Sequence, residues 1–181
     1  MSSIAVLAAR YLFEVLRSRY PTLPSQAGKV ARMHEFILTL SERDFSRLQD
    51  AGINKNQAIP QVGKLFLDFG FHAPTVAFPE VFGLMIEPTE SYTKKELDRF
   101  AEAVLAIKDL IENHPEVGAS APHFTPIDRV DEVSANRKLI LAEKLDHLPA
   151  LPLNRILPSV LQELDVPEIK RRILQANDLV C

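Results

Sequence analysis

The chain has 181 residues, of which 46% are hydrophobic and 25% are charged, and this composition is typical of a globular protein with an ordinary core. Its net charge of −3 argues against nucleic acid or an anionic membrane as the main partner, since both need a positive field, and no apolar run could span a bilayer. The single cysteine, Cys181, offers neither an internal disulfide nor a metal cluster, which fits a reducing, cytoplasmic location.

The N-terminal segment "MSSIAVLAARYLFEVLRSRY" is amphipathic and holds three arginines but only one acid, Glu14. Such a composition is shared with mitochondrial transit peptides. The helical spacing of its apolar residues favours the other interpretation, a structural helix from about Ile4 to Tyr20 that is capped by Ser2 or Ser3.

The next elements are a strand and a second helix. "HEFILTL", residues 34–40, has the β-branched and aromatic content of a strand, and the following "SERDFSRLQDAGIN" reads as a polar linker with some helical tendency. A helix is expected from Pro60 to Phe69, with Pro60 in its first turn. Gly70 is then expected to end this helix in the left-handed backbone conformation.

A short buried strand is expected over Leu84–Glu87, where Pro88 ends it. Thr93 and Glu96 have the spacing of a capping box and predict a third helix. The buried stripe of that helix would be Leu97, Phe100, Val104, Ile107 and Ile111.

This order of elements predicts an α/β fold (an α+β sandwich) in which a small sheet is covered by helices. We assign residues 1–115 to this small domain. Residues 116–181, rich in proline, are expected to form a wrapping tail with short helices, the last of them in "VPEIKRRILQANDLV".

The sequence contains no strong catalytic motif: "HEF" is not HExxH, and GxSxG, Walker and GxGxxG patterns are missing. Of the five histidines, His72 is the best candidate, because it lies between a helix stop and a rigid proline. Glu87 and Glu90 flank Pro88-Thr89 before the third helix. Glu87 and Glu90 either complement that helix dipole, or Thr89, Glu90 and Ser91 present polar groups to a ligand or partner.

Three segments carry a resemblance to a known family: "HEFILTL", "DFGFHAPTVAFPEVFGLMIEPTES" and "KKELDRFAEAVLAI". They resemble the C-terminal portion of the glycine cleavage system P-protein, the decarboxylating glycine dehydrogenase, and especially the second subunit of its two-subunit forms. The similarity extends over roughly residues 2–137. It departs from the family at "PEVFG", residues 79–83.

The resemblance implies the small C-terminal domain of a fold-type-I, aminotransferase-like pyridoxal-phosphate enzyme, which packs on the large cofactor domain and helps to close the active site. No catalytic residue and no metal is expected in this chain. The residues implied to face the cleft for substrate and cofactor are His34, His72, Thr75, Glu87, Thr89 and Glu90.

The family's cofactor lysine belongs to the large domain, so the chain is expected to bind no cofactor alone, although pyridoxal phosphate is implied for the complete enzyme. The lysines read as solvated; they include Lys29, Lys55, Lys64, Lys94 and Lys95. The implied partners are the missing large domain or first subunit and the lipoyl carrier protein. The chain would then be an excised, split or truncated piece of the enzyme that contributes to its lid and assembly surface.

Two alternatives stay open. The chain is either that piece or a standalone interaction or regulatory module, whose tail covers the former cofactor surface or mediates self-association into a homo-oligomer. The apolar tail residues that would do so are Leu148, Leu151, Leu153, Ile156, Leu157, Val160 and Leu161. An unrelated hydrolase using His72 with Glu87 or Glu90 is the weakest hypothesis, because no nucleophile has a recognised context.

Overall fold

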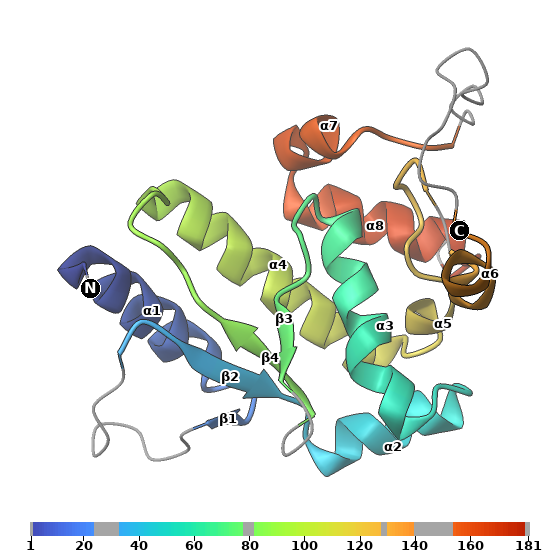
Figure 1. The fold of residues 1–181 in the computed structure, drawn as a ribbon, viewed down its shortest axis with the longest axis horizontal. Helices are drawn as coiled ribbons and strands as arrows, with labels where there is room; N and C mark the ends of the chain where they lie inside the picture. Colours follow the sequence, from blue (N-terminus) through green and yellow to red (C-terminus); the bar gives the residue numbers. More distant parts are fainter. Residues whose placement is uncertain (1, 24–32, 78–81, 128–129, 140–153, 180–181) are drawn as a thin grey trace.

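A computed structural model describes residues 2–23, 33–77, 82–127, 130–139 and 154–179. Figure 1 shows the arrangement of the helices and strands. In chain order they are α1 Ser3–Leu16, β1 Thr22–Leu23, β2 Phe36–Thr39, α2 Glu42–Asp50, α3 Lys55–Asp68, β3 Thr75–Ala77, β4 Gly83–Ile86, α4 Lys94–Asn113, α5 Val117–Ser120, α6 Glu132–Arg137, α7 Pro158–Glu163 and α8 Val166–Ala176.

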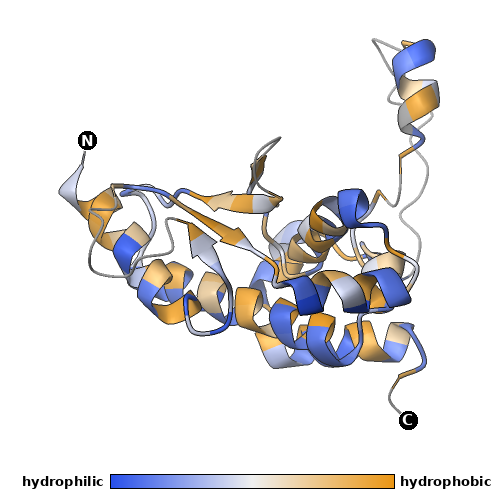
Figure 2. Cartoon of the chain, turned by 90° about the horizontal axis from the view of Figure 1, so that it is seen from below, coloured by the Kyte–Doolittle hydropathy of each residue, from blue (hydrophilic) through white to orange (hydrophobic). Residues whose placement is uncertain are grey.

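The strands form one four-stranded antiparallel sheet in the order β1-β2-β4-β3. Phe36 lies opposite Ile86 and Leu38 opposite Leu84, and all four side chains are buried. The core helices gather on one side of this sheet (Figure 2), so the apolar face of the strands packs on them. The predicted fold class, a small sheet covered by helices, is confirmed.

The first helix is confirmed, and its residues Leu12, Phe13 and Leu16 are buried in the core. Ser2 is its N-cap and accepts a hydrogen bond from the Ile4 N–H at 3.2 Å. The helix ends at Leu16 rather than at Tyr20.

The structure differs from the sequence-based expectations at three points between β1 and β3. The expected linker contains α2, because Ser41 and Asp44 form a capping box. Helix α3 begins at Lys55, so Pro60 lies inside it; Pro60 is exposed, where water can bind the carbonyl that proline leaves without a helical donor. Strands β1 and β3 were missed, since segments of two and three residues carry too little periodicity.

Most of the remaining predicted signals are confirmed, although Phe100 of the expected buried stripe is only half-buried. Gly70 has a φ of 79° directly after α3, and the strand β4 and the capping box of Thr93 and Glu96 occur as expected. The last predicted helix is α8. None of the helices in the described ranges is both long and apolar enough to cross a membrane.

One hydrophobic core joins the two ends of the chain. Leu161 of α7 and Ile169 and Ile173 of α8 are fully buried and belong to the same cluster as Phe66 of α3 and Ile107 of α4. The division of the chain at residues 115 and 116 stays a prediction.

Candidate functional site

A cavity of about 640 Å³ lies beside the segment that follows α3. Its walls come from that segment, the end of β4, the first turns of α4 and one residue of α7, Gln162. Three of the six predicted cleft residues, His72, Thr75 and Glu87, line it, and all three side chains are exposed. A second cavity of about 290 Å³, between α1 and β1, contains none of the six.

The loop Phe71–Thr75 owes its position to the end of α3. The Phe71 N–H donates to Phe66 O and the Gly70 N–H to Leu67 O, both at 3.0 Å, which is the Schellman pattern. Phe71 then packs edge-on against Phe100 of α4, with the ring centroids 5.3 Å apart. His72 therefore follows a tightly fixed turn.

His34 does not line the cavity but contacts it through Glu87. Its Nε2 lies 3.2 Å from Glu87 Oε1, and its Nδ1 is buried without a hydrogen-bond partner among the described residues. His34, Glu35 and Glu87 each offer one ligand atom within 4.8 Å of the others. These nitrogen and carboxylate donors are types that Zn²⁺ accepts, although three ligands are fewer than a closed structural site uses.

Thr89 and Glu90 lie in the exposed turn before α4 and do not line the cavity. The Thr89 hydroxyl accepts a hydrogen bond from the Ser91 N–H at 3.3 Å. The first turn of α4 holds Glu96 as its acidic residue, so Glu90 does not complement the helix dipole from within that turn.

Sequence reasoning missed Arg99, which belongs to the "ELDRF" motif and lines the cavity. Its guanidinium donates to four backbone carbonyls, those of Phe69, Leu161, Gln162 and Leu164. Burial lowers the pKa of Arg99 from its very high ordinary value. Three of its four acceptors lie in the tail, far from Arg99 in the sequence. No local sequence pattern could therefore predict these contacts.

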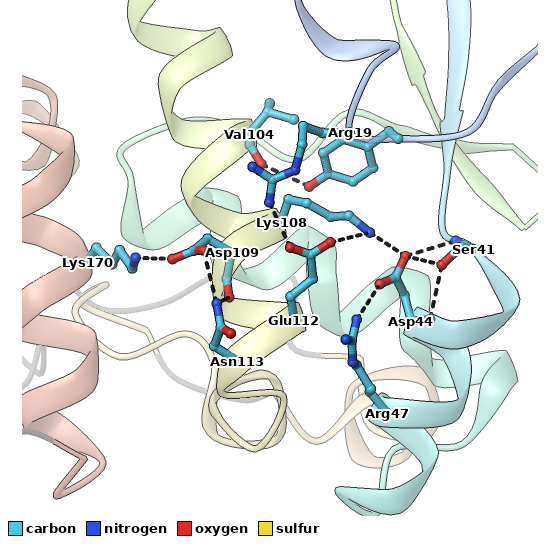
Figure 3. A network of polar contacts seen from close by, with 11 residues as sticks. Arg19, Ser41, Asp44, Arg47, Val104, Lys108, Asp109, Glu112, Asn113 and Lys170 are labelled. Carbon is cyan, nitrogen blue, oxygen red and sulfur yellow. Dashed lines mark hydrogen bonds and ion pairs between the residues drawn. The ribbon is translucent and has the colours of Figure 1, made fainter.

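A second polar network lies away from the cavity, between α2 and α4 (Figure 3). Lys108 of α4 and Asp44 of α2 are both buried and hydrogen-bonded to each other, and Ser41 also donates to Asp44. Next to them, the Tyr20 hydroxyl donates to Val104 O at 2.8 Å, and burial raises the pKa of Tyr20. None of these residues lines the cavity beside His72, whereas Tyr20 lines the second, smaller cavity.

A third cluster has the geometry of a serine–histidine–aspartate relay. His123 Nδ1 lies 2.7 Å from the buried Asp68 carboxylate, and its Nε2 lies 2.9 Å from Ser120 Oγ. However, the Ser120 hydroxyl donates to Asn177 Oδ1, and the Asn177 amide reaches the same His123 Nε2 at 3.0 Å. This arrangement holds the end of α8 against the segment after α5, and it does not present an activated nucleophile.

The described lysines do not fit a site for pyridoxal phosphate, which needs a buried, available amine. Lys55, Lys94, Lys95 and Lys138 are exposed, and Lys64 and Lys170 are half-buried. Lys108 is buried, but it pairs with Asp44 away from the cavity. Lys29 lies outside the described residues.

The fold and the cavity define an α+β module with an exposed, mixed polar and aromatic cleft at one end of its sheet. A family model described as "Glycine dehydrogenase, C-terminal domain" matches residues 1–123, which is most of the chain. The chain therefore belongs to the family of glycine dehydrogenase C-terminal domains, and the resemblance seen in the sequence is confirmed.

Curated relatives agree with this assignment. A probable glycine dehydrogenase (decarboxylating) subunit 2 from Prosthecochloris aestuarii is 45% identical over 141 residues, 77% of this chain and 26% of the relative. Proteins of the same name from Thermococcus gammatolerans and Pyrococcus furiosus are 41% and 39% identical over 80% of this chain and 27% of their own length. The chain thus spans about a quarter of the length of these relatives.

Proposed function

We propose that this chain serves as the small domain of a glycine-decarboxylating enzyme and contributes a lid and an assembly surface without catalysing the reaction alone. The observation that carries the proposal is the family match over residues 1–123 together with the cavity on which His72, Thr75 and Glu87 converge. The complete enzyme would use pyridoxal phosphate held by a large domain, since the described lysines of this chain do not fit that role.

The proposed partners follow from the same family. They are a large domain or first subunit that carries the cofactor, and a lipoyl carrier protein that accepts the aminomethyl group, and the proposed location is the cytoplasm. His34, His72, Thr75, Glu87, Thr89 and Glu90 are the proposed cleft-facing or interface residues. His72, Thr75 and Glu87 have the strongest support, because they are exposed and line the cavity.

The test measures cofactor binding and glycine decarboxylation with the chain alone and after mixing with a glycine dehydrogenase large domain or first subunit. We expect no aldimine absorbance for the chain alone and restored decarboxylation on mixing. His72→Ala should weaken the restored activity, whereas His114→Ala, at the far end of α4, should not. An aldimine formed by the chain alone would contradict the assignment of the cofactor to the partner.

A standalone interaction or regulatory module is the second candidate, and the tail favours it. Leu161 is fully buried, Ile156 packs on the core, and Gln162 lines the cavity, so the tail covers part of the surface beside His72. Leu157 and Val160 are exposed, and Leu148, Leu151 and Leu153 lie outside the described residues. Failure of both cofactor binding and complementation would support this second function.

A further inference from the structure

Arg99 of α4 joins the C-terminal ends of two helices. Its Nη1 donates to Phe69 O at 3.3 Å, at the end of α3. Its Nη2 donates to Leu161 O at 2.7 Å and to Leu164 O at 3.0 Å, and its Nε to Gln162 O at 3.0 Å, all at the end of α7. The last carbonyls of a helix have no partner within the helix and carry partial negative charge. One planar guanidinium with five N–H donors therefore satisfies both helix ends at once.

Gly70 brings α7 into direct contact with the turn before the cavity loop. A Cβ at Gly70 would lie 2.9 Å from Gln162 Cγ and 3.0 Å from the Gln162 backbone nitrogen, so these two segments of the chain are in contact and leave no space for a side chain at Gly70. The Gln162 side chain donates from Nε2 to Gly70 O at 2.9 Å. Leu161, next to it, is completely buried and anchors α7 in the core.

Phe71, the first residue of the cavity loop, contacts Arg99 and Phe100 of α4. The Arg99 guanidinium lies 5.2 Å from the centroid of its ring, and Phe100 packs edge-on against it. The carbonyls of Phe69 and Gly70 and the ring of Phe71 are thus all fixed by Arg99, Phe100 and Gln162. His72 is the next residue and lines the cavity.

We infer that Arg99 and Gln162 are positioning residues that set the orientation of the Phe71–Thr75 loop, and of His72 in particular, on the cavity. Gln162 lies in α7, outside the residues that the family model matches. The tail of this chain therefore provides part of the contacts that fix the loop. Any effect of this loop position on a reaction rests on the proposed function. The positioning itself rests on the contacts described above.

The test compares Gln162→Glu, which keeps the shape and removes the Nε2 donor, with Gln175→Glu on the exposed surface of α8 as the matched control. NMR of the 181-residue chain would follow amide exchange at Gly70 and Phe71, whose N–H groups close the turn, and the ring signals of His72. Loss of one hydrogen bond predicts roughly 3- to 10-fold faster exchange at these amides and shifted His72 ring signals, with no change in the control.

Arg99→Lys is the second variant, because it keeps the charge but loses the planar fork, and it should have a larger effect on the same signals. Unchanged Gly70 and Phe71 exchange and unchanged His72 signals in folded Gln162→Glu protein would overturn the inference, whether or not Arg99→Lys folds. The readout needs neither cofactor nor partner. A failed complementation would therefore count against the proposed function and leave this result standing.

Discussion

Gly70 has a backbone conformation that other residues adopt only at a cost, with a φ of 79°. Replacing it with alanine should cost about 1–2 kcal/mol for the left-handed conformation alone. The new Cβ would also collide with the backbone and side chain of Gln162, so the total loss in the free energy of unfolding should be larger. Urea unfolding of Gly70→Ala measures this loss.

Gly52 provides the matched control at the residue scale. It follows α2 with a φ of 86°, but a Cβ there would meet nothing within 4 Å. Gly52→Ala should therefore show only the backbone cost, and the difference between the two variants reports the contact with α7. Equal losses in the free energy of unfolding for Gly70→Ala and Gly52→Ala would mean that the contact with α7 adds no cost at Gly70.

At the scale of elements, the pair of Asp44 and Lys108 joins α2 to α4 in the interior. Burial by itself raises the pKa of Asp44, but hydrogen bonds from Lys108 and Ser41 outweigh it and lower the pKa below its ordinary value. A carboxyl whose pKa is lower in the folded state stabilises the fold above its unfolded pKa of about 3.9. That contribution is lost as the pH falls through the folded pKa.

The free energy of unfolding should therefore stay nearly level from pH 7 to pH 5 and decrease below about pH 4. Asp44→Asn should remove part of this decrease and cost roughly 3–5 kcal/mol at neutral pH, because it leaves Lys108 buried without its main partner. Glu42→Gln, which breaks the exposed pair with Lys55, should change little. Urea unfolding across pH would contradict this account if Asp44→Asn and Glu42→Gln behaved alike.

At the scale of the whole molecule, the shared core of the tail and the family-matched region predicts a single unfolding transition. Ile169→Ala in α8 should lower the midpoint of that transition and cost roughly 2–5 kcal/mol, since its side chain is fully buried. Val160→Ala, at a position that is 44% exposed, serves as the control. Two separate transitions by circular dichroism would instead support the predicted boundary after residue 115.

Elements with local sequence signals could be predicted without the structure. The Thr93 and Glu96 capping box, the Gly70 stop and the periodicity of α1, α4 and α8 each depend on neighbouring residues, and the structure contains all of them. The family was also readable, because its motifs are long and continuous. The tertiary structure alone decided the edge strands, which hydrogen bonds to a partner strand stabilise, and the pairing of Asp44 in α2 with Lys108 in α4.

The residues of the candidate site also fall into two groups, those that the sequence could reveal and those that only the packed structure reveals. His72 and Glu87 could be found in the sequence beside conspicuous prolines, and Thr75 through the family resemblance, and the three line one cavity. Arg99 and Gln162 could not, because their importance lies in contacts across 62 to 92 residues of sequence that form only when α7 packs beside α3. Local patterns fix local backbone conformation, whereas the walls of a cavity come from distant segments that only the packed core brings together.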